Sequence, residues 1–297
     1  MKNPKFSVII PTYNRVNQIK DAIKSVLEQT LESFEIIVID NCSTDNTVSL
    51  INNFKDKRIK FFSVKNKGII AYSRNFGIKK SIGKYIAFLD SDDSWAKNKL
   101  EECIPYLENG SDLIYHNLII KNNQKNFFPF KKKCLCRKLD KDNIYNDLIS
   151  NGPAFPTSSV IVKKNIFKKI KYFNENKNLV TWEDFDAWIR LSNMTNNFYR
   201  INKNLGYLGQ GKNNLLNFKK RIENIFKFKF KYLKSNLELP DWCLYELSKL
   251  YFRTENYDLA IKYFTKINFK LKNINNFFKV LIYYFLIKIK KLTKISF

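Results

Sequence analysis

An apolar run that ends in carboxylates is the feature of this sequence that most constrains its fold. Five apolar or aromatic residues, Tyr85–Leu89, lead into Asp90, Asp92 and Asp93. An uninterrupted apolar run of this length is typical of a strand buried on both faces, as in a parallel sheet. Three acids within four positions repel one another unless a cation lies between them, and hard divalent cations prefer carboxylate and phosphate oxygens. The run therefore predicts a metal–diphosphate site at the carboxyl edge of a parallel sheet, with a solvated acidic turn as the alternative.

Alternating strands and helices precede this run. Strands are predicted at 6–10, 35–39 and 58–64, with amphipathic or apolar helical segments after each one. This alternation favours a Rossmann-like α/β fold with a mainly parallel sheet flanked by helices. Pro11 is expected to end the first strand and Asn17 to cap the first helix. No glycine-rich phosphate loop follows any of these strands, so metal and side chains have to hold the phosphates of a nucleotide.

The third helix, predicted over 70–82, is expected to turn Tyr72, Phe76 and Ile78 inward. Further on, strands are predicted at 112–121 and 159–162, with a basic, Phe-rich excursion over 122–137 between them. A helix over 182–191 opens with Glu183 and Asp184. Acids in a first turn also stabilise a helix electrostatically, which gives this pair a structural explanation. The segment 241–268 is predicted to form a helical hairpin.

The charge of the chain is strongly and unevenly positive. The formal net charge is +26, and residues 201–297 carry 20 basic against 6 acidic side chains. This pattern favours an anionic surface as partner, either a membrane or a nucleic acid. The five scattered cysteines fit a reducing compartment. With His116 as its only histidine, the chain is a poor candidate for a histidine-based metal site or a Ser-His-Asp triad.

The C-terminal part of the sequence is rich in apolar and basic residues. Phe277–Ile289 is the longest apolar stretch, and it is interrupted by Lys279 and Lys288. It is too short for a bilayer span, which needs ~20 residues, so it is predicted to lie in the membrane interface. Packing of these residues on a domain is the alternative. The N-terminus has no apolar segment long enough for a signal peptide. The expected division is a domain over 1–214 and a basic helical region over 215–297.

Five segments together resemble glycosyltransferase family 2, whose fold is called GT-A. In chain order they are Ser7–Arg15 (SVIIPTYNR), Ile36–Asp45 (IIVIDNCSTD), Ser73–Gly77 (SRNFG), Gly83–Asp93 (GKYIAFLDSDD) and Trp182–Asp184 (WED). Each motif is weak alone, but their order is specific, and the resemblance covers roughly residues 5–210.

The resemblance implies a role for each matching residue. Pro11, Thr12 and Asn14 would line the nucleotide pocket, Asp40 would accept from the uracil N–H, and Arg74 would help to position the diphosphate or base. Asp90, Ser91 and Asp92 form the Asp-x-Asp motif at the donor. Asp90 and Asp92 would bind Mg²⁺ or Mn²⁺, with Asp92 the more direct ligand. Asp184 would be the general base.

Two departures from the family pattern stand out. Many members carry a histidine where this chain has Tyr207–Leu215, and Gln210 or Lys212 is the candidate substitute. The Gln-x-x-Arg-Trp motif of processive cellulose and chitin synthases is absent. A non-processive enzyme that adds one sugar is therefore expected.

The resemblance implies an inverting, metal-dependent hexosyltransferase. The expected donor is a UDP-hexose, with glucose the best guess. The expected acceptor is a polyprenyl-diphosphate-linked oligosaccharide at the cytoplasmic membrane face, where the protein would be peripheral and bound to anionic lipid. In length and tail the chain resembles the branching glucosyltransferases of protein N-glycosylation. Assembly of lipopolysaccharide, capsule or O-antigen is an alternative. A nucleic-acid-binding protein with the same fold is a weaker alternative, because a sequence rich in Lys and Asn can also result from an AT-rich genome. No nucleic acid is therefore expected as partner.

Overall fold

The computed structural model describes residues 3–121, 133–179, 181–209, 218–233, 237–268, 285, 288 and 289. The chain forms two compact units. The first contains Met1–Tyr145 and Pro153–Asn213, and the second contains Asn146–Gly152 and Asn214–Phe297.

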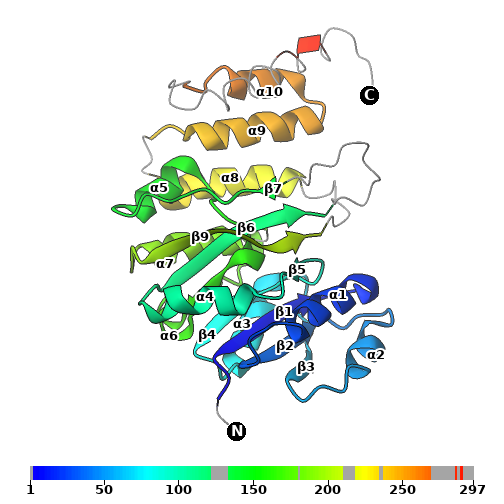
Figure 1. The fold of residues 1–297 in the computed structure, drawn as a ribbon. Coiled ribbons are helices and arrows are strands. Elements are labelled where there is room, and N and C mark those ends of the chain that lie inside the picture. Colours follow the sequence, from blue (N-terminus) through cyan, green and yellow to red (C-terminus); the bar gives the residue numbers. More distant parts are fainter. Residues whose placement is uncertain are drawn as a thin grey trace, which may run out of the picture. The chain divides into compact units, whose positions relative to one another are not determined.

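A twisted mixed sheet is the centre of the first unit (Figure 1). Its order is β3-β2-β1-β4-β8-β6-β9-β5, with β7 paired to β6. The four strands β1 (Phe6–Thr12), β2 (Phe34–Asp40), β3 (Ile59–Ser63) and β4 (Tyr85–Phe88) are parallel, as predicted. The α/β fold class expected from the sequence is confirmed.

Beyond β4 the sheet contains both antiparallel and parallel strand pairs. The remaining strands are β5 (Ser94–Trp95), β6 (Leu113–Ile120), β7 (Lys133–Cys134), β8 (Ile161–Lys163) and β9 (Phe198–Leu208). Strand β8 is antiparallel to both β4 and β6, β6 is parallel to β9, and the short β5 and β7 are antiparallel to their partners. The parallel half of the sheet therefore ends at β4, the acid-tipped strand that leads into Asp90, Asp92 and Asp93.

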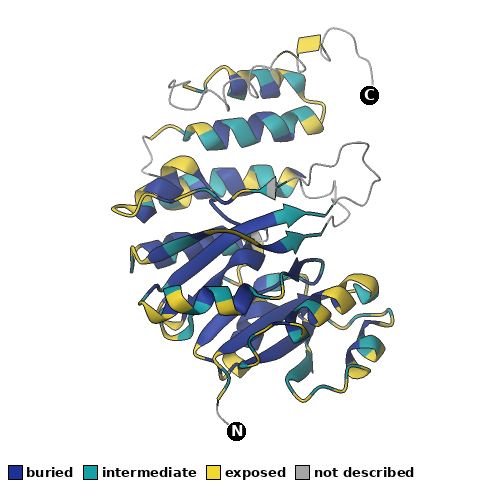
Figure 2. Ribbon diagram, in the orientation of Figure 1, coloured by how far each residue is buried: buried dark blue, intermediate teal, exposed yellow. Residues whose placement is uncertain are grey.

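The two faces of the parallel half are covered by different helices. Even-numbered residues of β1 and β2 pack with α1 (Val16–Leu27) and α4 (Lys99–Glu108) in one apolar cluster. On the other face lies α3 (Ile70–Lys80), where a Cβ on Gly77 would come within 2.6 Å of Ile39 and 3.0 Å of Ile9. Both faces are consequently buried, and the strands contain almost no exposed residues (Figure 2).

Three local predictions are corrected by the structure. Pro11 lies inside β1. The N–H groups of Tyr85 and Leu89 donate to the carbonyls of Lys5, just before β1, and of Ile9, so the odd-numbered backbone groups of this segment face β4. The backbone nitrogen of Pro11 thus faces β4, but the pairing of β1 with β4 ends at Ile9. The missing N–H of Pro11 therefore removes no hydrogen bond between these two strands. Helix α1 begins at Val16, so Asn17 is not its cap.

On α3 the prediction was wrong for Tyr72, which is 38% exposed, whereas Ile78 is buried as expected. The buried face of this helix also includes Ser73, Arg74 and Asn75, three polar residues. The helix therefore presents a polar surface to the interior of the first unit, and apolar periodicity could not reveal it.

Before β9 the described residues also form the helices α2 (Thr47–Asn52), α5 (Ile144–Asn151), α6 (Lys164–Lys169) and α7 (Glu183–Ser192), with the 3₁₀ turns η1 (Thr157–Ser159) and η2 (Lys177–Leu179). Most of α5 belongs to the second unit. An aromatic cluster joins α6 and α7 to β4. In it Phe88 lies 5.8 Å from Phe167, 5.2 Å from Phe173 and 6.1 Å from Trp188, measured between ring centroids. The start of α7 is thereby fixed near the end of the acid-tipped strand.

The second unit is helical, with α8 (Phe218–Tyr232), α9 (Asp241–Arg253) and α10 (Tyr257–Phe264). The predicted hairpin is confirmed by α9 and α10, which pack through buried Leu247 and Ala260. Phe228 of α8 contacts Trp242 of α9 at 5.1 Å between centroids.

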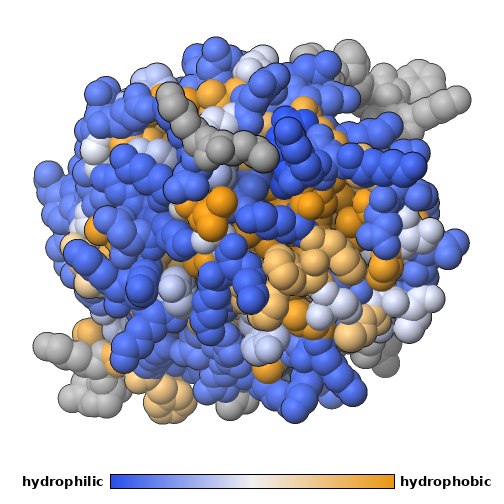
Figure 3. Space-filling view, turned by 90° about the horizontal axis from the view of Figure 1, so that it is seen from below, coloured by the Kyte–Doolittle hydropathy of each residue, from blue (hydrophilic) through white to orange (hydrophobic). Residues whose placement is uncertain are grey.

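Among the described residues, no helix is long and apolar enough to span a bilayer. The face of the molecule in Figure 3 is largely hydrophilic, with hydrophobic side chains gathered in one region. Most of the predicted excursion over 122–137, and most of the C-terminal segment from Phe277, lie outside the described residues.

Candidate active site

The carboxyl ends of β1, β2 and β4 meet at one edge of the sheet, because these three strands are parallel neighbours. Thr12 and Asp40 are register partners at the ends of β1 and β2. Pro11 and Thr12 are buried, and the Thr12 hydroxyl has no hydrogen-bond partner among the described residues. Open α/β sheets bind ligands at such an edge.

Two loops at this edge are tied together by hydrogen bonds. Asn14 adopts a positive φ of 48°, its N–H donates to Ser43 Oγ at 2.9 Å, and its Oδ1 accepts from the Thr44 N–H at 2.8 Å. The carboxylate of Asp40 accepts from the Ser43 N–H at 2.8 Å and also from the Ser43 hydroxyl. Asp40 is fully buried, and these bonds fix the orientation of its carboxylate.

The acid turn, Asp90–Asp93, follows β4. Arg15 lies 3.7 Å from Asp92, and the Gly209 N–H donates to Asp93 at 2.8 Å. Burial, together with the negative charge of Asp90, raises the pKa of Asp92 and raises the pKa of Asp93 to about 7. Ser91 is buried within the turn. The negative charge of the acid turn is therefore not fully balanced by the cationic side chains around it.

Arg74 links the acid turn to the start of α7. One guanidinium nitrogen donates to Asp90 at 2.7 Å, and another donates to Glu183 at 2.8 Å. The Arg74 side chain is only 4% exposed. Burial alone would lower the pKa of Arg74, but the charges of Asp90 and Glu183 outweigh it, so the pKa rises and the cation is retained. Burial raises the pKa of Glu183 in spite of this cation.

Asp184 lies next to this bridge and is partly exposed. Its Oδ2 accepts from the Thr157 hydroxyl at 2.7 Å, and its Oδ1 accepts from the Phe185 N–H at 2.7 Å. Each carboxylate oxygen keeps lone-pair capacity for another donor. Asp184 is therefore an oriented carboxylate that can accept a further hydrogen bond and that is separate from the acid turn.

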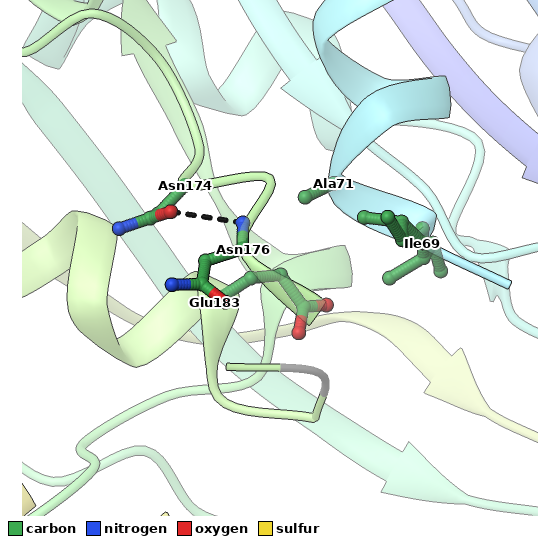
Figure 4. Close-up of a pocket in the computed structure, with 6 residues that line it drawn as sticks. Ile69, Ala71, Asn174, Asn176 and Glu183 are labelled. Carbon is green, nitrogen blue, oxygen red and sulfur yellow. Dashed lines mark hydrogen bonds between the residues drawn. The ribbon is translucent and has the colours of Figure 1, made fainter. Parts of the chain in front are cut away.

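A small pocket opens at the N-terminus of α3 (Figure 4), and it is lined by Ile69, Ile70, Ala71, Asn174, Asn176 and Glu183. Glu183 points into it, and its Oε2 is buried and accepts no hydrogen bond from the described residues. Glu183 thus uses one oxygen for Arg74 and keeps the other beside the pocket.

The residues present fit a hard divalent cation. Asp90, Asp92 and Asp93 supply oxygen ligands, and their mutual repulsion is what a cation would relieve. In the described part of the chain, no three His, Cys, Asp or Glu side chains converge well enough to hold a metal by themselves. This arrangement is typical of Mg²⁺ sites in which one or two carboxylates and the phosphates of the substrate share the ion.

The structure brings Asp90, Arg74 and the Glu183–Asp184 pair together, while Pro11, Thr12, Asn14 and Asp40 line the neighbouring β1–β2 edge. The sequence did not predict that Glu183 forms an ion pair with Arg74, or that the hydroxyls of Thr157 and Ser158 lie at the site. The only signal for these hydroxyls was the Thr-Ser-Ser run before a short strand, which is common in loops. Gln210 and Lys212 lie outside the described residues.

Known proteins resemble this chain in sequence and in fold. The family model described as "Glycosyl transferase family 2" matches residues 7–178. An uncharacterised glycosyltransferase of Rickettsia conorii is 40% identical over 65% of this chain. The chain spans only 27–31% of the length of this and two other Rickettsia relatives. The Escherichia coli protein WfgD, named UDP-Glc:alpha-D-GlcNAc-diphosphoundecaprenol beta-1,3-glucosyltransferase, is 30% identical over 86% of this chain and 93% of its own length.

Solved structures share the fold. Staphylococcus aureus TarS, residues 1–349 in complex with UDP-GlcNAc, aligns with a TM-score of 0.62 at 21% identity, covering 93% of this chain and 79% of that TarS segment. The mannosyltransferase PcManGT of Pyrobaculum calidifontis, in complex with GDP-Man and Mn²⁺, aligns with a TM-score of 0.60 at 14% identity, covering 100% and 89%. With a family model matched over more than half of its residues and the WfgD alignment over most of both chains, the chain belongs to glycosyltransferase family 2.

Proposed function

We propose that this protein transfers one hexose, with glucose as our first choice, from a UDP-sugar to a polyprenyl-diphosphate-linked oligosaccharide, with inversion at the anomeric carbon. Residues 1–214 would form the catalytic domain and residues 215–297 a membrane-binding region at the cytoplasmic face. A single observation carries this proposal. The acid turn and Asp184 are two separate acidic sites, joined by Arg74, which contacts Asp90 directly and Glu183 beside Asp184.

Inverting transfer is a single displacement and needs both of these sites. The acceptor hydroxyl attacks the anomeric carbon and loses its proton, while the bond to the diphosphate breaks. Asp184, held by Thr157 and by the Phe185 N–H, would accept that proton. The buried Arg74 would stay cationic throughout and would keep the Asp90 carboxylate oriented toward the donor.

Asp90 and Asp92 would hold Mg²⁺ or Mn²⁺, and such an ion neutralises charge that develops on a leaving diphosphate. At the β1–β2 edge, Asp40 would accept from the base N–H, and Pro11, Thr12 and Asn14 would enclose the nucleoside. Ser43 supports this assignment, because it fixes the Asp40 carboxylate in one orientation.

The choice of donor and acceptor rests on a relative. The name of WfgD gives UDP-glucose as its donor and a lipid-linked GlcNAc diphosphate as its acceptor. Assembly of a protein-linked oligosaccharide, lipopolysaccharide, capsule or O-antigen would all use acceptors of this class. Non-processive transfer is supported by the absence of the Gln-x-x-Arg-Trp sequence.

The test is a screen of purified protein against UDP-glucose, UDP-galactose, UDP-GlcNAc and GDP-mannose, with polyprenyl-diphosphate oligosaccharides as acceptors and mass spectrometry as readout. We expect a single mass increase of one hexose with a UDP-hexose, dependent on Mg²⁺ or Mn²⁺. The Asp184→Asn variant should give no product, whereas Glu108→Gln, a change in an exposed carboxylate paired with Lys5, should behave like wild type. Ladders of products would contradict non-processive transfer. No transfer with any donor, combined with a gel shift on nucleic acid, would favour the nucleic-acid alternative.

Membrane binding is proposed from the charge and exposure of the second unit. On α8, Phe230 is 85% exposed and stands between Lys229 and Lys231. Of the C-terminal segment, the structure describes Phe285 and Ile289, which are 56% and 49% exposed. Exposed aromatic residues among lysines suit an anionic interface, where each lysine contributes about 1 kcal/mol.

Flotation with vesicles that contain phosphatidylglycerol tests this proposal. Phe230→Ser should lower the bound fraction, and truncation after Asn276 should lower it further. Neutral phosphatidylcholine vesicles serve as the control for charge. Equal binding of wild type and truncated protein to anionic vesicles would refute the anchor, and a lowered melting temperature of the truncated form would indicate a packing role instead.

A further inference from the structure

The three-residue turn η1 contacts both acidic sites of the first unit. The Thr157 hydroxyl donates to Asp184 Oδ2 at 2.7 Å, and the Asp90 N–H donates to Ser158 Oγ at 3.0 Å. Thr157 and Ser158 are 4% and 1% exposed. One short turn therefore contacts the carboxylate of Asp184 and the backbone of Asp90, two residues that are far apart in the sequence and that the proposed reaction must hold at a fixed separation.

The turn is itself held by further hydrogen bonds from Trp95, Lys99 and β4. The carbonyl of Ser158 accepts from Trp95 Nε1 at 3.0 Å and from Lys99 Nζ at 3.1 Å. Lys99 is fully buried, with its ammonium group 3.4 Å from the centroid of the Trp95 ring. The carbonyl of Val160, directly after the turn, accepts from the Phe88 N–H of β4. These bonds leave η1 little freedom to move relative to the acid-tipped strand.

The contact with Thr157 restricts how Asp184 can be oriented. The carboxylate is held at one oxygen by the Phe185 N–H, and the remaining freedom is rotation of the group about its Cβ–Cγ bond. A second donor on the other oxygen removes that rotation. The free lone pairs then point in a defined direction, and a general base has to lie within hydrogen-bond reach of the proton that it takes.

We propose that Thr157 is a positioning residue that orients the Asp184 carboxylate toward the acceptor hydroxyl, and that η1 fixes Asp184 relative to the acid turn. This inference rests on the proposed function, in which Asp184 takes the proton. A hydroxyl at position 157 is the required group, and the methyl of threonine is dispensable.

The experiment compares steady-state kinetics of full-length wild type, Thr157→Val, Thr157→Ser, Asp184→Asn and the double variant Thr157→Val/Asp184→Asn. We expect Thr157→Val, which keeps the side-chain shape, to lower kcat roughly 10- to 100-fold, which is less than the roughly 10²- to 10⁴-fold that the general base itself supplies. The KM for the UDP-sugar and the affinity for UDP, measured by calorimetry, should stay within about twofold. Thr157→Ser should restore kcat to within about threefold of wild type. The double variant should be no slower than Asp184→Asn, because Thr157 acts through Asp184.

Thr195→Val is the matched control, because Thr195 donates to Asp112 Oδ2 at 2.7 Å, directly before the first residue of β6. It should keep the wild-type kcat. If Thr157→Val fails to fold, Thr157→Ala tests the same hydroxyl. A Thr157→Ser variant as slow as Thr157→Val, a loss confined to KM, or an additive double variant would overturn the positioning role. An active Asp184→Asn variant would refute the proposed base itself. Inactive Asp184→Asn beside fully active Thr157→Val would refute the inference alone.

Discussion

Replacing Arg74 by Met should destabilise the protein, because it leaves a buried carboxylate without its cationic partner. Arg74 Nη1 lies 2.8 Å from Glu183 Oε1, and both side chains are nearly inaccessible, at 4% and 7% exposure. Asp90, the other partner, is 34% exposed and can be rehydrated. Breaking a buried pair by removal of one partner costs about 3–5 kcal/mol. We therefore expect the free energy of unfolding to fall by about that amount at pH 7, with Glu183 as the main cause.

The loss should depend on pH in a defined direction. Burial already raises the pKa of Glu183 in the folded protein above its unfolded value, and removal of Arg74 removes a cation that opposes this rise. Over the window between the unfolded and folded pKa values, the folded state then binds more protons than the unfolded state, so stability falls as pH increases. The Arg74→Met variant should accordingly lose less stability at pH 5 than at pH 7.

Urea denaturation followed by fluorescence and circular dichroism at both pH values measures these changes. Glu183→Gln in the Arg74→Met background should recover roughly 1–3 kcal/mol, because the stranded charge is gone. Lys5→Met removes an exposed pair of similar length, 2.9 Å to Glu108, and should cost less than about 1 kcal/mol. A loss below about 1 kcal/mol in Arg74→Met, or a double variant less stable than Arg74→Met, would refute the reasoning.

Three further predictions follow from the site and the fold. Asp92→Ala should abolish transfer and weaken UDP-sugar binding in Mg²⁺ or Mn²⁺, measured by calorimetry; a wild-type rate, or wild-type activity unaffected by EDTA, would contradict the metal assignment. Asp184→Asn should keep UDP affinity while kcat falls roughly 10²- to 10⁴-fold, and a parallel loss of UDP affinity would instead indicate donor binding. Gly77→Ala should destabilise by about 1–3 kcal/mol, since its Cβ would lie 2.6 Å from Ile39 and overpack the interface of α3 with the sheet; an unchanged melting temperature would show that Ile39 can move aside.

The sequence by itself determined the parallel half of the fold. The apolar runs that became β1, β2 and β4 are buried on both faces, and such runs have few alternatives to central strands. The parallel direction of these strands followed from the βαβ spacing, which also placed Asp40 and Asp90 at the carboxyl ends of their strands. The local pattern was therefore sufficient where the strands are buried on both faces.

Only the tertiary structure decided which charges meet. The expected cap of α1, Asn17, was wrong, because the N–H of Val16 is bound by Asp45 from another loop. A cap supplied from a distant segment leaves no trace in the local sequence. In the same way, apolar periodicity described the buried face of α3 incorrectly, since that face is partly polar and is buried against other polar groups.

The site itself shows the same division. Its carboxylates could be identified from the sequence, because acidic residues at the ends of strands and helices are conspicuous next to apolar segments. Their partners could not, because the contact of Arg74 with Glu183 and that of Thr157 with Asp184 each join separate segments of the chain. Hydrogen bonds and ion pairs depend on distances of about 3 Å, and only the packing of β4, α3, η1 and α7 against one another sets those distances.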